Sequence, residues 1–265
     1  MNYKQTFDNL KKRNEKALIP FIVIGDPDYE TSLAIVKKIV ESGADILELG
    51  FPFSDPIADG PTIQAADVRS LYKKTNIDDC FRFIKEVRKF TQIPIGLLVY
   101  YNLIFQRETE KFFHDCRSAG VNSVLAADVP IEESDDLISA ARKHRIDTIF
   151  IVSPLTDDKR LRSILSKCQG FVYIVARLGV TGARDDLKDS TLNLIKRVRQ
   201  QTKLPICVGF GISQPEHIKA VCKAGADGAI VGSALVKIIG DNLDDKRSMI
   251  GKIEKYTKEL KRSTK

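Results

Sequence analysis

Carboxylates that could exchange protons with a substrate are concentrated in the segment ILELGFPFSDPIADGP, residues 46–61. Glu48 interrupts an apolar run that is predicted to be a buried strand. Because side chains alternate along a strand, Glu48 should face away from Leu47 and Leu49 and point into a site. Loss of water there would raise the pKa of Glu48 toward the range in which a carboxyl group both gives and takes protons. The alternative is a core glutamate held in a salt bridge.

Two more carboxylates, Asp55 and Asp59, follow on the loop that leaves this strand. Asp59 is predicted to lie above Glu48, so two carboxyl groups in different surroundings could take separate duties in one reaction. For Asp55, an ordinary loop cap is an almost equally good interpretation. The segment therefore predicts an acid–base site at the end of a strand.

Eight short apolar runs, rich in β-branched residues, recur along the chain, as is typical of parallel strands buried on both faces. The amphipathic stretches between them are predicted to be helices. Eight such alternations predict an α/β fold of the (β/α)8 TIM barrel type, with a doubly wound open sheet as the alternative. The runs begin at residues 18, 44, 93, 121, 147, 170, 205 and 228.

The two longest steps between these runs carry residues 46–61 and the segment RLGVTGARDDLKDS, residues 177–190. Active sites of (β/α)8 barrels are built from loops at the C-terminal ends of the strands, so extra length there indicates function. Thr181 and Gly182 in the second segment could close over a bound phosphate.

An additional helix is predicted before the first strand, in YKQTFDNLKKRN, residues 3–14, and it could plug the bottom of the barrel. No linker or low-complexity segment divides the sequence. We therefore expect one barrel domain over residues 1–265.

Two glycine segments, VGFGISQPEHI and VGSALVKII, predict a phosphate site at the ends of the last two strands. In the first, Gly211 would let a backbone N–H group approach an anion, and Ser213 and Glu216 have the spacing of a capping box. In the second, Gly232 and Ser233 open a short helix, whose N-terminus offers unpaired N–H groups and a positive dipole end. The alternative is that these glycines only form tight turns.

The sequence lacks the patterns of a metal centre and of a covalent nucleophile. Neither a GxSxG motif nor a Cys–His arrangement is present. Lys237 is predicted to be solvated or to steer phosphate rather than to form a Schiff base. The three histidines are predicted on helices away from the strand ends, at the surface, and are His114, His144 and His217.

The composition favours a cytoplasmic protein that binds neither nucleic acid nor membrane. Five cysteines include no CxxC pair, which indicates reduced thiols. Much of the net charge of +7 lies in the tail, residues 251–265, which is predicted to be a solvated helix face, and an anionic small substrate is a simple use of the positive field. No apolar run is long enough to cross a bilayer, and the N-terminal segment lacks the apolar core of a signal peptide.

These motifs and their order resemble those of the tryptophan synthase alpha chain family. LELGFPFSDPIADGP is the most specific of them, and PFIVIGDPD, GLLVYYNLIF, ADVPIEES, RLGVTGA, GFGIS and IVGSALVKII also occur in the family's order. The resemblance implies cleavage of indole-3-glycerol phosphate to indole and glyceraldehyde 3-phosphate, with no cofactor and no metal in this subunit. It also implies a partner, a pyridoxal-phosphate-dependent β chain in an α2β2 complex, which receives indole through a tunnel.

The resemblance further implies roles for individual residues. Glu48 matches the general acid/base that protonates indole C3 and takes the hydroxyl proton, and Asp59 matches the aspartate that accepts a hydrogen bond from the indole N–H group. The positions that match the partner contact surface are Asp55, Pro56, Asn102, Phe105 and Pro130. The positions that match the substrate site are Phe21, Tyr100, Tyr173, Thr181, Gly182, Gly211, Gly232 and Ser233.

Three positions differ from the residues that the family pattern leads us to expect, namely Val23, Tyr101 and Leu178. These differences concern the reaction rate and the affinity for the partner, and they leave the reaction class unchanged.

Two other functions compete with the lyase. Another phosphate-binding barrel enzyme, such as an epimerase or an indole-glycerol phosphate synthase, would need a metal or histidine site, or inward lysines, which the sequence lacks. A non-catalytic regulatory subunit of the same complex would not need Glu48 and Asp59.

Overall fold

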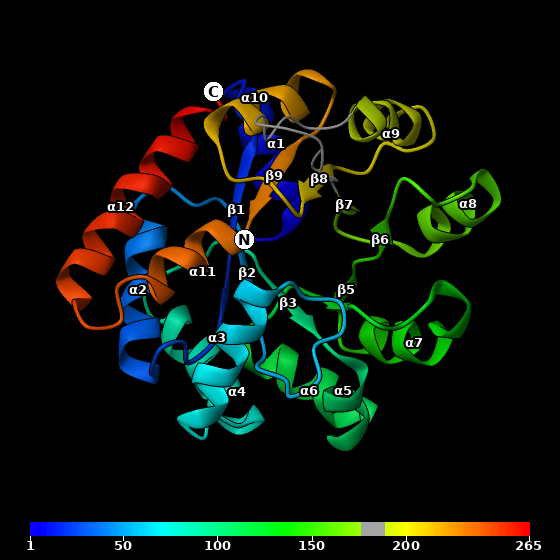
Figure 1. Ribbon diagram of the computed structural model, residues 1–265. Helices are drawn as coiled ribbons and strands as arrows, with labels where there is room; N and C mark the ends of the chain where they lie inside the picture. Colours follow the sequence, from blue (N-terminus) through cyan, green and yellow to red (C-terminus); the bar gives the residue numbers. More distant parts are fainter. Residues whose placement is uncertain (176–188) are drawn as a thin grey trace.

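Parallel strands form a ring at the centre of the structure, with helices around it (Figure 1). This computed structural model describes residues 1–175 and 189–265. The ring confirms the predicted (β/α)8 barrel and excludes the doubly wound open sheet. The strands are β1 (Ala17–Val23), β2 (Leu47–Gly50), β3 (Ile95–Val99), β4 (Ser123–Ala126), β5 (Asp147–Thr148), β6 (Ile151–Val152), β7 (Val172–Val175), β8 (Ile206–Gly209) and β9 (Gly228–Val231).

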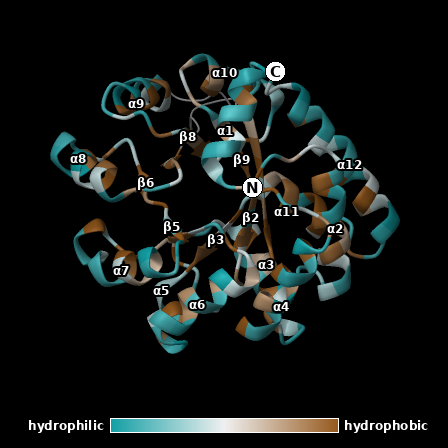
Figure 2. Ribbon diagram, turned by 180° about the vertical axis from the view of Figure 1, so that it is seen from behind, coloured by the Kyte–Doolittle hydropathy of each residue, from teal (hydrophilic) through white to brown (hydrophobic). Residues whose placement is uncertain are grey.

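Helices cover the outside of the ring, and their outward faces are largely hydrophilic in Figure 2. Among the described residues, no helix combines the length and the apolar character that crossing a membrane requires. The helices are α1 (Tyr3–Lys12), α2 (Tyr29–Glu41), α3 (Pro61–Tyr72), α4 (Ile77–Arg88), α5 (Tyr101–Gln106), α6 (Thr109–Ala119), the 3-10 turn η1 (Ile131–Glu133), α7 (Asp135–Lys143), α8 (Asp158–Lys167), α9 (Asp189–Arg199), α10 (Pro215–Lys223), α11 (Ser233–Gly240) and α12 (Lys246–Arg262).

The fifth apolar run, predicted as one strand, forms the two short strands β5 and β6. Ile149, between them, donates its backbone N–H to the carbonyl of Val124 on the β4 side (3.0 Å). The carbonyl of Phe150 accepts the N–H of Tyr173 on the β7 side (3.3 Å). The segment therefore changes its partner in the middle, and this change joins the two ends of the strand order and closes the barrel.

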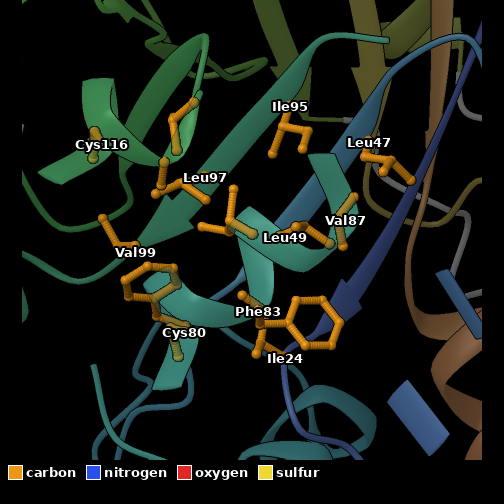
Figure 3. Packing of buried hydrophobic residues seen from close by; sticks show 14 of the residues in the cluster. Ile24, Leu47, Leu49, Cys80, Phe83, Val87, Ile95, Leu97, Val99 and Cys116 are labelled. Atoms are coloured by element: carbon orange, nitrogen blue, oxygen red, sulfur yellow. The ribbon is translucent and has the colours of Figure 1, made fainter. Parts of the chain in front are cut away.

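Apolar side chains on the outer face of the ring pack under the helices. Leu47 and Leu49 of β2 belong to the core cluster that includes the apolar face of α4, as Figure 3 shows. Each of these leucines is at most 1% exposed. Because neighbouring side chains alternate along a strand, Glu48 between them faces the inside of the barrel.

Helix α1 covers the bottom of the barrel. A capping box between Asn2 and Gln5 starts the helix. The hydroxyl of Tyr3 is hydrogen-bonded to Oγ of Ser123 at the beginning of β4 (2.6 Å), and its ring meets Phe171 edge-on, with centroids 5.4 Å apart. The N-terminal ends of the strands are thus filled by α1, and the C-terminal ends are left to form a site.

Candidate active site

Glu48 lies in the mouth of the barrel, almost fully removed from water. It is 5% exposed and lines a cavity of about 230 Å³ together with Asp59, Phe21 and Tyr173. Burial, and then the nearby charge of Asp59, raises the pKa of Glu48 to about 8. No cationic side chain of the described residues offsets this rise, so Glu48 is not the salt-bridged core glutamate that the sequence left as an alternative.

Asp59 is held by a tyrosine that follows the neighbouring strand. The hydroxyl of Tyr100 donates a hydrogen bond to Oδ2 of Asp59 (2.7 Å) and accepts one from the N–H of Ala58 (3.0 Å). Burial raises the pKa of Asp59, and the bond from Tyr100 lowers it, because that bond favours the charged carboxylate. Tyr100 itself stands behind Asp59 and is not among the residues that line the cavity. The two acids therefore have different surroundings.

The two glycine segments line the same cavity from the ends of β8 and β9. Gly211 has a φ of +86°, a left-handed conformation that favours glycine. At Gly232, a Cβ atom would meet the ring of Phe21 at 3.0 Å, so glycine permits this close approach. Helix α11 begins directly afterwards at Ser233 without a side-chain cap, which leaves the N–H groups of its first turn without an intrahelical partner. The segments can therefore bind an anion at the cavity.

Helix α10 begins differently from the prediction. Its N-cap is Gln214, without a side-chain hydrogen bond, so the predicted capping box between Ser213 and Glu216 is wrong. The N–H of Ser213 donates instead to Nδ1 of His217 (3.3 Å). His217 is 6% exposed, so its predicted surface position is also wrong, because the imidazole turns back toward the start of its own helix.

The remaining walls of the cavity are mostly apolar and come from residues that were not predicted for the site. Leu98 of β3 and Ile230 of β9 line it, and strand alternation could have identified both. Ile63, near the start of α3, also lines it, as does Phe210, which lies within the first glycine segment. An apolar chamber with two carboxyl groups and an anion-binding rim fits a ligand that has both a flat apolar ring and a phosphate.

The positions that match the partner contact surface lie on the loops after β2, β3 and β4. Phe105 on α5 is 62% exposed, and Ile57 on the loop after β2 is 84% exposed. Tyr101 adds a partly buried ring whose centroid is 6.3 Å from that of Phe105. Large apolar side chains gathered on such loops are unusual for a free surface.

Thr181 and Gly182, together with Leu178, fall at residues 176–188, outside the described residues. Val23 is buried in the cluster inside the barrel. Within the described residues, no group of three or more His, Cys, Asp or Glu side chains could hold a metal ion.

Comparisons with known proteins point to one family. A family model described as "Tryptophan synthase alpha chain" matches residues 7–265. A tryptophan synthase alpha chain of Methanothermobacter thermautotrophicus is 49% identical over 261 residues, which cover 98% of this chain and 96% of that one. A solved structure from Aquifex aeolicus is 36% identical, with a TM-score of 0.90 and full coverage of both chains. A chain from the α2β2 complex of Pyrococcus furiosus is 37% identical, with a TM-score of 0.88, and the match covers 93% of this chain and 98% of that one.

The substitution Glu48→Gln should make the stability of the protein less dependent on pH. In the unfolded chain Glu48 ionises near its ordinary pKa of 4.5, whereas the folded carboxyl group keeps its proton up to about pH 8. The stability that Glu48 contributes is therefore fully present below about pH 4.5 and is lost as the pH rises to about 8. Glutamine cannot ionise, so the variant should gain at least about 1 kcal/mol on the wild type between pH 5 and pH 8.

Urea unfolding of both proteins at several pH values measures this difference, and titrating groups that do not interact with Glu48 cancel in the comparison. A stability difference that does not change with pH would show that Glu48 ionises normally in the folded protein.

Proposed function

The chain belongs to the tryptophan synthase alpha chain family and is an indole-3-glycerol-phosphate lyase of tryptophan biosynthesis, and we propose that Glu48 and Asp59 carry out its chemistry. The observation that supports this proposal is one cavity lined by both carboxyl groups and by Gly211, Gly232 and Ser233. A single sugar-phosphate with an indole ring can occupy that cavity with its phosphate at the glycines and its ring near the acids.

Glu48 acts as both acid and base in the proposed reaction. Its raised pKa leaves the free carboxyl group protonated at neutral pH, so it can give that proton to C3 of the indole ring. The bond between C3 and the glycerol carbon then breaks, and its electron pair restores the aromatic ring. The hydroxyl group on the glycerol carbon becomes the aldehyde and passes its proton to the Glu48 carboxylate. Glu48 thus ends the cycle protonated, as it began.

Asp59 stabilises the charge that develops during this reaction. When C3 gains a proton, positive charge grows at the ring nitrogen, and an ionised Asp59 accepts a hydrogen bond from the ring N–H. The hydroxyl of Tyr100 keeps Asp59 in place and favours its charged form. The hydrogen bond from Tyr100 thus favours the charged form of Asp59, whereas burial favours the neutral form of Glu48, and the two proposed roles differ accordingly.

The partner of this chain is a tryptophan synthase β chain in an α2β2 complex. The Pyrococcus furiosus relative belongs to such a complex, in which the subunits activate each other. The loops after β2, β3 and β4 supply the contact surface, and the candidate positions on it are Asp55, Pro56, Asn102, Phe105 and Pro130. Indole produced at the cavity is then passed to the β chain.

The whole chain, residues 1–265, is proposed to form one barrel domain. The family match over residues 7–265 and the packing of α12 against α2 and α11 support this assignment. A cytoplasmic location is proposed from the five cysteines, none of which is paired in a disulfide.

The variant Glu48→Gln should release indole from indole-3-glycerol phosphate at least about a hundredfold more slowly than the wild type, because glutamine cannot transfer the protons. The purified chain is assayed for indole, alone and with a β chain. Circular dichroism and thermal unfolding show that the variant is folded. Ordinary turnover by the variant would refute the acid/base role, and no indole from the wild type under either condition would refute the catalytic function.

The variant Asp59→Asn should lower kcat on the order of a hundredfold and change KM much less. Asparagine keeps the size of the side chain but loses the negative charge that stabilises the transition state, which is worth roughly 3 kcal/mol. Steady-state kinetics at saturating β chain separate the two constants. A loss confined to KM would mean that Asp59 contributes to ground-state binding only.

The variant Phe105→Asp should weaken binding to the β chain by at least about tenfold and leave the indole release of the isolated chain unchanged, because exposed aromatic residues are frequent anchors of interfaces. Isothermal titration calorimetry measures the affinity. Leu243→Asp is the matched control, since Leu243 is also partly exposed (41%) but lies between α11 and α12, away from α5. Equal affinities for both variants would place the interface elsewhere.

A further inference from the structure

Asp67 is a buried carboxyl group that the proposed reaction does not use. It lies on α3, directly after the loop that carries Asp59, and is 4% exposed. Its Oδ1 accepts the backbone N–H of Phe53 at 3.4 Å. Its Oδ2 is also buried and has no hydrogen-bond partner among the described residues. A buried acid in this condition is costly, which suggests a role beyond stability.

Two further contacts connect Phe53, the hydrogen-bond partner of Asp67, with the active site. The ring of Phe53 stacks on the ring of Tyr100, with centroids 4.9 Å apart and planes 19° apart. The hydroxyl of Tyr100 then holds Asp59 and the backbone of Ala58. Two contacts therefore hold the loop after β2. Asp67 accepts a hydrogen bond from its beginning, at Phe53, and Tyr100 donates one to its end, at Asp59.

We infer that Asp67 is a positioning residue for the lyase reaction: it holds the backbone at Phe53, and through the stack of Phe53 on Tyr100 it sets the place of the Asp59 carboxylate. The inference rests on the proposed role of Asp59. Asp67 itself does not line the cavity and does not contact the substrate.

The charged groups around Asp67 determine whether its carboxyl group is protonated. Asp59 on the loop after β2 and Asp26 on the loop after β1 are acidic, and Tyr100 stands on the β3 side. The one cation nearby on α3, Arg69, is engaged by Asp26 through two bonds of 2.7 and 2.9 Å. Burial, then Asp59, raises the pKa of Asp67 to about 7 although the bond from Phe53 lowers it. Asp67 is therefore largely neutral below pH 7, and above it a second negative charge appears beside Asp59.

Two substitutions separate the hydrogen bond of Asp67 from its charge. Asp67→Asn keeps an oxygen for the N–H of Phe53 but cannot ionise. Asp67→Leu has a similar size and offers no acceptor. At pH 6.5 the Asn variant should keep kcat within about threefold of the wild type. The Leu variant should lose about tenfold to a hundredfold in kcat, because even a small misplacement of a catalytic group slows the reaction. Its KM should change less than about threefold.

The pH profile tests the charge. The ratio of kcat at pH 8 to kcat at pH 6.5 should differ between Asp67→Asn and the wild type, because only the wild type gains a charge beside Asp59. Ser70→Ala is the matched control: Ser70 is buried on the same helix, and its hydroxyl donates to the carbonyl of Ile24 (2.7 Å), away from Asp59. This control should lower the unfolding temperature and leave kcat and the ratio unchanged.

The inference is overturned if Asp67→Leu folds and keeps the kcat of the wild type, or if Asp67→Asn leaves the ratio unchanged. If the Leu variant does not fold, the ratio for the Asn variant alone decides. Glu48→Gln and Asp59→Asn are measured in the same assay. If these two keep full activity, the proposed roles fail and this inference with them; if they lose activity while the Asp67 variants behave as wild type, only the positioning role fails.

Discussion

The removal of one carboxyl group from water is the constraint on which the rest of the site depends. Glu48 occupies an inward position of β2 because its neighbours Leu47 and Leu49 pack outward under α4. A shift of one residue in the register would bury the leucines in the mouth and place the acid under the helices. The same alternation that builds the core therefore fixes the acid, and the closed ring of strands keeps that register in place.

The site combines two kinds of binding that need different structures. Backbone N–H groups bind an anion without adding a charged side chain, and the uncapped start of α11 supplies them at a place where Gly232 lets Phe21 approach. The chemical groups instead sit on β2 and on the loop after it. Because binding and chemistry come from separate strands, each can be held rigidly by the barrel and neither requires the other to move.

The sequence predicted what is periodic or local, and missed what depends on distant contacts. The alternation around Glu48 and the eight apolar runs predicted the barrel and the inward acid. The split of the fifth run into β5 and β6 could not be predicted, since it arises where Ile149 and Phe150 bond to strands on opposite sides. His217 and Asp67 were likewise missed as functional or buried groups, because a helix pattern does not show that a polar side chain turns toward a neighbouring loop. Tyr100 was predicted as part of the substrate site, but its position behind Asp59 depends on how the loop after β2 folds back.

Three acids near one mouth raise the question of how an anionic substrate enters. If Glu48, Asp59 and Asp67 were all ionised, they would repel a phosphate that must reach Gly211 and Ser233 at the same cavity. Burial raises the pKa values of Glu48 and Asp67 to about 8 and about 7, so below pH 7 these two acids add little negative charge to the mouth. The burial that makes Glu48 a proton donor thus also reduces the electrostatic barrier to the substrate. One physical cause, the loss of water around carboxyl groups, accounts both for the chemistry of the site and for its ability to accept an anion.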